Sequence, residues 1–169
     1  MHVHCLTNSI SSPVSEAYVR GTDPELAALF GGHAGDPEAW RRRAERLERH
    51  LHDRADATRV AEALAAYNRR IGASGRALAN IDRLAAGALA VVGGQQAGLF
   101  TGTVLVIYKA LSIIHAARWA EEKTGRPVVS VFWIAGEDHD WQEANHAYIV
   151  SRETGLVRIA VEREEHPRT

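Results

Sequence analysis

The sequence has little that would point to nucleic acid, to a membrane or to the cell exterior. Cys5 is the only cysteine among 169 residues, so no internal disulfide can form, and the cytoplasm is the expected compartment. The formal net charge of −1 provides no basic surface of the kind that binds nucleic acid or anionic lipid. We therefore expect neither nucleic acid nor a membrane among the partners of this protein.

Long apolar runs are also missing. The most apolar segment, residues 104–114, is interrupted by Lys109 and is too short to span a bilayer. Residues 1–12 do not combine a basic region with an apolar one, so we expect no secretory signal. Hydrophobic residues nevertheless make up 46% of the chain, which is enough for one domain with a core.

Residues 88–135 have the pattern of a strand, a loop, a helix and a second strand. Residues 88–92 are a short apolar run between glycines, which indicates a buried strand. A helix is predicted over residues 103–124, because a glycine and then a proline follow it. Residues 127–135 are apolar on both faces, which predicts a parallel strand covered on both sides. Together these elements predict a right-handed βαβ unit.

Other elements are predicted on either side of this unit. The segment 36–86 is expected to be helical, with start signals such as Asp36 and Ser74. Residues 146–162 are expected to form a β-hairpin around a turn at 153–155. The expected fold class is therefore α/β, with a partial parallel sheet between a helical segment and a hairpin. Such a sheet is thin, so we expect the chain to hold part of a fold, and an open sheet edge would favour a homo-oligomer.

Residues 93–102 are expected to form a glycine-rich loop after the first strand. Glycines let a backbone approach a ligand closely, and the N-terminus of the following helix favours an anion. The loop matches neither G-x-G-x-x-G nor the Walker A pattern, so it predicts a nucleotide or another anion in general. The alternative is a tight structural turn in which Thr101 or Thr103 caps the helix. The candidate cofactor contacts in this loop are Gly94, Gln95, Gln96, Gly98, Thr101 and Gly102.

Lys109 interrupts the apolar part of the predicted helix. A lysine in such a place either extends to solvent or pairs with an anion. A ligand phosphate and Glu137 are both possible partners. We therefore include Lys109 among the candidate cofactor-binding residues.

A cluster of ionisable residues follows the second strand, and it consists of Glu137, Asp138, His139 and Asp140. Close like charges raise the pKa of a carboxyl, and a neighbouring carboxylate raises the pKa of a histidine. Either shift can produce a general acid or base near neutral pH. These four residues are the candidate catalytic residues.

Asn145 and His146 follow the cluster closely and are candidate substrate contacts. One alternative is a divalent metal bound by His139, His146 and a carboxylate. The spacing of the two histidines is not a recognised ligand pattern, so we assign no metal site, and the need for a metal stays open. A second alternative is a solvated acidic loop that caps a helical turn at residues 141–145.

Three sequence motifs together resemble one known family. The motifs GGQQAGLFTG (93–102), YKA (108–110) and VFWIAGEDHDWQEANH (131–146) resemble the N-terminal region of the bacillithiol-biosynthesis cysteine-adding enzymes, the BshC family. Thr103 stands where proline is usual in that family, and Tyr108 where histidine is common. The family is also far longer, so the resemblance covers only its N-terminal portion.

The resemblance implies a Rossmann-like core and, beyond the part present here, further core strands and a C-terminal coiled coil. It also implies an enzyme that ligates cysteine to glucosaminyl-malate, which is the last step in making the thiol bacillithiol. The motif positions that carry over as candidate ligand contacts are Gln95, Gln96, Thr101, Lys109, Glu137, Asp138, His139, Asp140, Asn145 and His146.

Three functions are compatible with these patterns. The first is the cysteine ligase, in which ATP or another adenine nucleotide would activate a carboxylate, because amines do not attack free carboxylates at useful rates. The second is a nucleotidyltransferase-like enzyme that acts on a different amine. The third is a truncated nucleotide-binding or interaction module without stand-alone activity.

Overall fold

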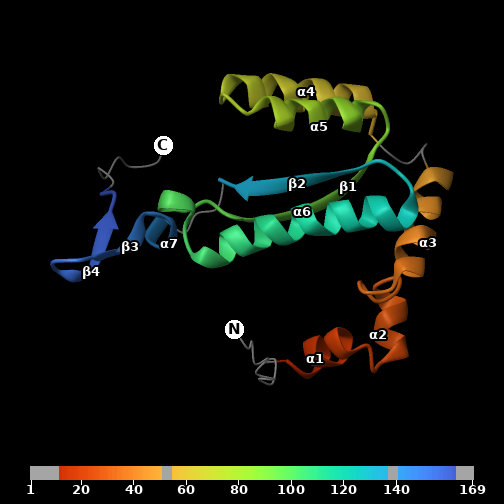
Figure 1. Cartoon of the computed structure of the whole chain (residues 1–169), viewed down its shortest axis with the longest axis horizontal. Coiled ribbons are helices and arrows are strands. Elements are labelled where there is room, and N and C mark those ends of the chain that lie inside the picture. Colours follow the sequence, from red (N-terminus) through yellow and green to blue (C-terminus); the bar gives the residue numbers. More distant parts are fainter. Residues whose placement is uncertain (1–11, 51–54, 137–140, 163–169) are drawn as a thin grey trace, which may run out of the picture.

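The structure is a computed structural model and describes residues 12–50, 55–136 and 141–162 (Figure 1). In this part of the chain, no helix is long and apolar enough to cross a membrane. The elements in chain order are α1 Pro13–Arg20, α2 Pro24–Leu29, α3 Pro37–Arg49, α4 Ala57–Arg70, α5 Gly75–Ala85, β1 Leu89–Gln96, the short 3-10 helix η2 Leu99–Thr101, α6 Val104–Thr124, β2 Val128–Ala135, α7 Trp141–Ala144, β3 His146–Ser151 and β4 Gly155–Ala160.

Two parallel strands and the helix between them form the centre of the fold. β1 pairs with β2 in a register that runs from Leu89 opposite Val128 to Gln96 opposite Ala135. Helix α6 packs on both strands from one side, and the α4–α5 hairpin lies on the other side, where α5 contacts β2 (Figure 1). A separate antiparallel hairpin, β3–β4, follows at the end of the sheet where both strands finish. The predicted α/β fold, with a parallel pair followed by a hairpin, is confirmed.

The first strand is longer than the sequence pattern predicted. The apolar run ended at Val92, and a loop was expected from Gly93 onward. β1 instead continues through both glycines to Gln96 and keeps its pairing with β2 over that length. The difference arises because the partner strand supplies hydrogen bonds to extended backbone whatever the side chain, and a hydrophobic pattern does not report them.

The second strand is covered only at its start. Val128 and Val129 are buried, whereas Trp133 and Ile134 are 59% and 65% exposed. The prediction that β2 is covered on both faces is therefore wrong for its second half within the described residues. Helix packing explains the difference, because the buried alanines of α6 cluster with Val128 at the beginning of the strand.

The core is built largely from small side chains. Ala117 and Ala120 of α6 pack with Val128, and three larger side chains, Trp40, Leu89 and Val91, pack against this cluster. A second cluster joins α4 to α5 through Ala61, Ala65 and Ile81. Alanines at these positions let helices approach closely, so a larger residue there would force the packed elements apart.

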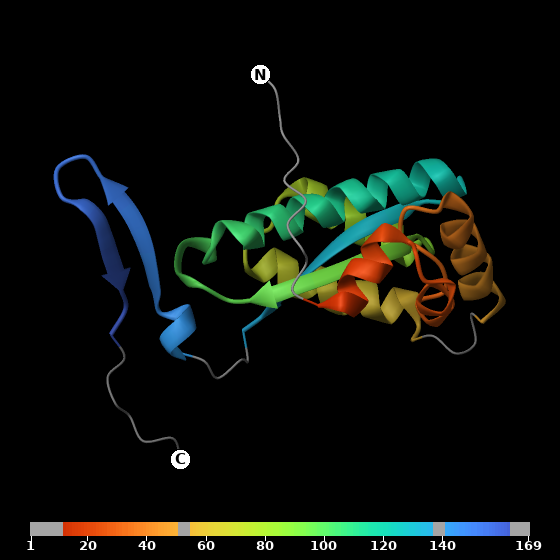
Figure 2. The ribbon, with the colours of Figure 1, turned by 90° about the horizontal axis from the view of Figure 1, so that it is seen from below.

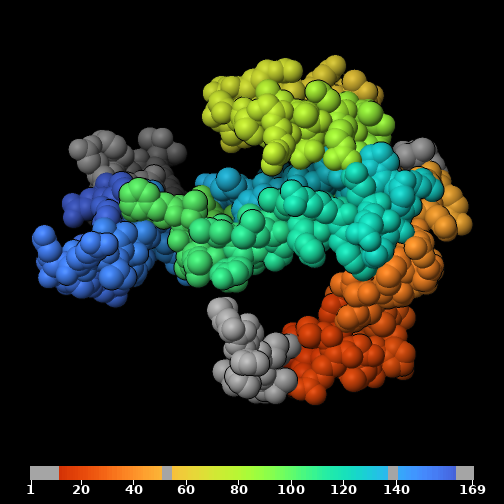
Figure 3. All heavy atoms as spheres, in the orientation of Figure 1, coloured from red at the N-terminus to blue at the C-terminus, as the bar shows by residue number. Residues whose placement is uncertain are grey.

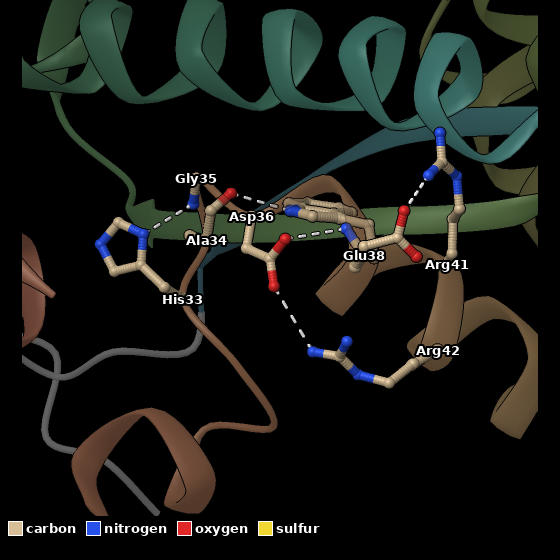
Figure 4. A network of polar contacts seen from close by, with 8 residues as sticks. His33, Ala34, Gly35, Asp36, Glu38, Arg41 and Arg42 are labelled. Atoms are coloured by element: carbon tan, nitrogen blue, oxygen red, sulfur yellow. Dashed lines mark hydrogen bonds and ion pairs between the residues drawn. The ribbon is translucent and has the colours of Figure 1, made fainter. Parts of the chain in front are cut away.

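Three aspartates and a serine cap helices α2 to α5, and Asp36 and Ser74 are the start signals that the sequence predicted. Asp36 accepts the backbone N–H of Glu38 at 3.0 Å and so caps α3 (Figure 4). Beside this cap, the indole N–H of Trp40 donates to the carbonyl of Ala34 at 2.8 Å. Trp40 then packs edge to face against Trp119 with ring centroids 5.6 Å apart. The start of α3 is thereby tied to α6.

The first two helices lie apart from the sheet. α1 and α2 contact each other, and Figure 3 shows them joined to the rest of the molecule through α3. Their contact uses Tyr18, whose ring lies 4.7 Å from Phe30 and 5.4 Å from His33 between centroids.

Glu121 joins three elements near the end of α6. Its carboxylate accepts the backbone N–H of Val128, the first residue of β2, at 2.9 Å and a guanidinium N–H of Arg83 from α5 at 2.5 Å. The bond from Val128, and after it the bond from Arg83, lower the pKa of Glu121 below its ordinary value. The carboxylate form therefore helps to fix where β2 begins.

We expect Glu121→Gln to lower the stability of the protein at neutral pH by about 0.5–1 kcal/mol. The amide oxygen can still accept the N–H of Val128, but the charge opposite Arg83 is lost, and the 44% exposure of the side chain keeps the effect small. Because the folded pKa of Glu121 is lowered, the stabilisation is fully present above the ordinary pKa of a glutamate and is lost as the pH falls through the folded pKa. Chemical denaturation of both proteins from pH 7 to pH 3 should show the two stabilities converging at the acid end.

Glu122→Gln provides the matched control. Glu122 is the next residue along α6, and its carboxylate pairs with Lys123 at the surface. This change should leave the stability close to that of the wild type. An equal loss in the two variants, or a Glu121→Gln loss that persists at pH 3, would contradict the role given to Glu121.

Candidate functional site

The carboxyl ends of β1 and β2 lie side by side. Gln96 is the register partner of Ala135, and the N–H of Ala97 donates to the carbonyl of Ala135 at 3.3 Å. The chain that follows β1 and the chain that follows β2 therefore leave from the same edge of the sheet. This is the edge at which open α/β sheets bind ligands.

The four candidate catalytic residues, Glu137, Asp138, His139 and Asp140, lie outside the described residues. The described chain stops at Gly136, directly after β2, and resumes at Trp141, the first residue of α7. Their catalytic roles stay predictions. Among the described residues, no group of three or more histidine, cysteine, aspartate or glutamate side chains is placed to hold a metal ion.

The structure brings together two of the predicted cofactor contacts. The ammonium group of Lys109, on α6, donates to the amide oxygen of Gln95, on β1, at 2.6 Å. Lys109 was expected to meet either a ligand phosphate or Glu137. Its partner among the described residues is a neutral amide, and its side chain is exposed at the carboxyl end of β1.

The glycines of β1 let the chain pack closely on itself. A Cβ atom on Gly94 would lie 2.6 Å from the backbone oxygen of Trp133 in β2, and one on Gly93 would lie 2.4 Å from the side chain of Ile113 in α6. Both distances are too short for any residue with a side chain unless something moves. Close packing therefore explains why glycine occupies both positions. A ligand contact at Gly94 stays a prediction.

The loop between β1 and α6 holds an unusual backbone. Phe100 and Thr101 have φ angles of 52° and 74°, a left-handed conformation that residues with side chains adopt only at a cost of about 1–3 kcal/mol each. Gly98 and Gly102 pass so closely that a Cβ on Gly98 would lie 2.9 Å from the Cα of Gly102. Thr103 is the N-cap residue of α6, but its side chain makes no capping hydrogen bond. Thr103, one of the two threonines that the structural alternative invoked, therefore does not cap the first turn of α6 with its side chain.

The hairpin places the predicted substrate contacts near this loop. β3, which begins at His146, packs against η2, which ends at Thr101 (Figures 1 and 2). Asn145 and His146 are both partly buried. The structure therefore brings the segment of Thr101 and the segment of His146 together, although about 45 residues separate them along the chain.

The imidazole of His146 has a defined orientation. Its Nδ1 lies 2.9 Å from the backbone oxygen of Gln142 and 3.1 Å from the side-chain oxygen of Asn145. A carbonyl oxygen can only accept a hydrogen bond, so in the neutral ring Nδ1 carries the proton. Nε2 then has the free lone pair, which can accept a proton or a hydrogen bond.

Sequence reasoning did not identify Gln142 or Ile113 as supporting residues. Gln142 orients His146 through its backbone oxygen, and the i, i+4 spacing across a helical turn is the signal that could have suggested it. Ile113 fills the space above Gly93, and no local pattern reports such a contact between two elements.

The fold and the site define a Rossmann-like α/β domain whose candidate ligand residues gather at the carboxyl ends of parallel strands. Residues 1–169 match the family model described as "Bacillithiol biosynthesis BshC, N-terminal Rossmann-like domain". The chain therefore belongs to the BshC family, and the resemblance seen in its motifs is confirmed.

Several curated relatives carry the name "Putative cysteine ligase BshC". The chain is 45% identical over 145 residues to one from Geobacillus thermodenitrificans, a match that covers 85% of this chain and 26% of the relative. It is 40% identical to one from Geobacillus kaustophilus, over 95% of this chain and 29% of the relative. A relative from Heliobacterium modesticaldum is 39% identical, over 96% of this chain and 30% of its own length. The chain thus spans less than a third of these relatives.

We expect Gly94→Ala to destabilise the protein by about 1–3 kcal/mol, because the new methyl group would collide with the backbone of β2 rather than with a movable side chain. Thermal or chemical denaturation would measure the loss.

Gly75→Ala is the control for this substitution. Gly75 is the first residue of α5 and has open space where a Cβ would lie, so alanine should be neutral or stabilising by up to about 1 kcal/mol. If Gly94→Ala were as stable as Gly75→Ala, the close approach of the two strands at Gly94 would be wrong.

Proposed function

We propose that the chain is the N-terminal part of a ligase that joins the carboxyl group of cysteine to the amine of glucosaminyl-malate, with ATP activating the carboxylate. The observation that carries this proposal is the pairing of Gln96 with Ala135, because it opens the two candidate loops at one edge of the sheet. The relatives named as cysteine ligases of the BshC type support the reaction class.

The first step requires the activation of a carboxylate. A carboxylate oxygen of cysteine would attack a phosphorus atom of ATP, which forms an acyl phosphate and releases ADP, or forms an acyl adenylate and releases pyrophosphate. The exposed ammonium group of Lys109 is suited to bind the negative charge of the phosphates. The first turn of α6, which the Thr103 side chain does not cap, lies at the same end of the helix and presents backbone N–H groups that favour an anion.

The second step forms the amide. The amine of glucosaminyl-malate would attack the activated carbonyl carbon, a C–N bond would form, and phosphate or AMP would leave. The attacking nitrogen must then give up a proton. Among the described residues, His146 is suited to take it, because its Nδ1 proton is fixed toward Gln142 and Nε2 keeps a lone pair. His139 and the neighbouring acids remain candidates for the same role.

The proposal predicts that the protein converts labelled cysteine, glucosaminyl-malate and ATP into the cysteinyl product. Liquid chromatography with mass detection would measure that product and the nucleotide released. His146→Gln should slow product formation by about a hundredfold or more, as the loss of a general base does, while binding of ATP stays unchanged. Absence of product from the full-length gene product would contradict the ligase.

A second candidate function is a nucleotide-binding or interaction module without stand-alone activity. The exposed apolar side chains of α6 and β2, which include Tyr108, Leu111 and Trp133, favour it, because such surfaces commonly mark contacts with other polypeptides. Binding of ATP by the 169-residue chain without any product would support this function over the first.

A further inference from the structure

Helix α6 faces β1 through a regular series of contacts. Alternate residues of β1 point toward the helix, beginning with Leu89 and Val91, which pack against the cluster that contains Ala117 and Ala120. Two residues further along the strand, Gly93 lies under the side chain of Ile113. The next strand residue on this face is Gln95, and the next helix residue, one turn before Ile113, is Lys109.

Gln95 and Lys109 therefore form a polar contact at the end of an otherwise apolar interface between α6 and β1. Gly93 has no side chain, so Ile113 can fill the space directly above the strand and α6 can lie close to it. That separation lets the amide of Gln95 reach the ammonium group of Lys109 at 2.6 Å. The geometry of the pair is set by the packing below it.

The chemical type of the partner determines whether the charge of Lys109 is neutralised. A carboxylate in the place of Gln95 would neutralise the ammonium group, whereas an amide oxygen only orients it. The other lysine of the chain shows the contrast, because Lys123 pairs with Glu122 at 2.7 Å. Among the described residues, Lys109 forms no ion pair. Gln95 thus holds the positive charge of Lys109 in place beside the carboxyl end of β1 without neutralising it.

We propose that Gln95 is a positioning residue, which holds the ammonium group of Lys109 without neutralising it, as a cation for the polyphosphate of a nucleotide. This assignment rests on the proposed function for the identity of the ligand. It differs from the sequence prediction, in which Gln95 itself contacted the ligand. The essential property of Gln95 is a neutral acceptor oxygen at that distance from Lys109.

Binding of inorganic tripolyphosphate and of ATP to the 169-residue protein, measured by titration calorimetry, tests the assignment. Gln95→Glu should weaken both ligands by about fivefold, the upper range for an exposed ion pair, because the new carboxylate neutralises Lys109. Gln95→Met keeps the length of the side chain but removes the acceptor oxygen, and should weaken binding less than Gln95→Glu. Lys109→Ala should weaken binding at least as much as Gln95→Glu.

Asn80→Asp is the charge control, because it adds the same negative charge on α5, which lies on the opposite side of the sheet from α6 (Figure 1). It should change the affinity for tripolyphosphate by less than Gln95→Glu does. Adding Gln95→Glu to Lys109→Ala should cost little more than Lys109→Ala alone, since the two residues act as a unit. Thermal melts would establish that each variant is folded.

Equal affinities for Gln95→Glu and Asn80→Asp would overturn the assignment, as would fully additive losses in the double variant or a wild type that does not bind tripolyphosphate. Failure of the proposed ligase is a separate result. In that case the wild type and the variants would show the expected order of affinities, while the cysteinyl product would not form.

Discussion

The parallel pairing of β1 with β2 is the constraint on which the site depends. Its register carries Gln96 to the side of Ala135, so the chain leaves both strands at one edge. Nothing in the local sequence of either loop would bring them together without that pairing. Glu121 contributes to the register from the opposite end, because its carboxylate holds the first N–H of β2 against α6 and α5. The contacts at the start of β2 therefore help to determine where its carboxyl end lies.

The packing of α6 on β1 determines where the positive charge of Lys109 lies relative to the end of the paired strands. Small residues, Ala117 and Gly93, let the helix approach the strand, and the same closeness allows Lys109 to meet Gln95. On the other side of the loop, contact between η2 and β3 brings a histidine of fixed tautomer near the same region. A cation that can bind phosphate and a nitrogen lone pair that can accept a proton are two groups that the proposed ligase reaction would use.

Hydrophobic periodicity predicted the elements well but not their ends or their exposure. The stop at Gly125 and the apolar run after Pro127 identified α6 and β2, because these signals act within a few residues of the chain. The continuation of β1 through Gly94 depends on a partner strand, and the exposure of Trp133 depends on which helices cover it. Motif spacing likewise named Gln95 and Lys109 but could not show that they bind each other, since that contact follows from the packing of a helix on a strand.

The most direct test is cross-linking at the tips of the two strands. In a Cys5→Ser background, cysteines placed at Gln96 and Ala135 should form a disulfide under mild oxidation, because neighbouring strands lie about 4.8 Å apart, within the range that a disulfide spans. Cysteines at Gln96 and Val128 should not, because seven residues of strand separate Val128 from Ala135, which is about 23 Å. Failure of the first pair to cross-link, or equal cross-linking of both pairs, would show that the two loops do not open side by side.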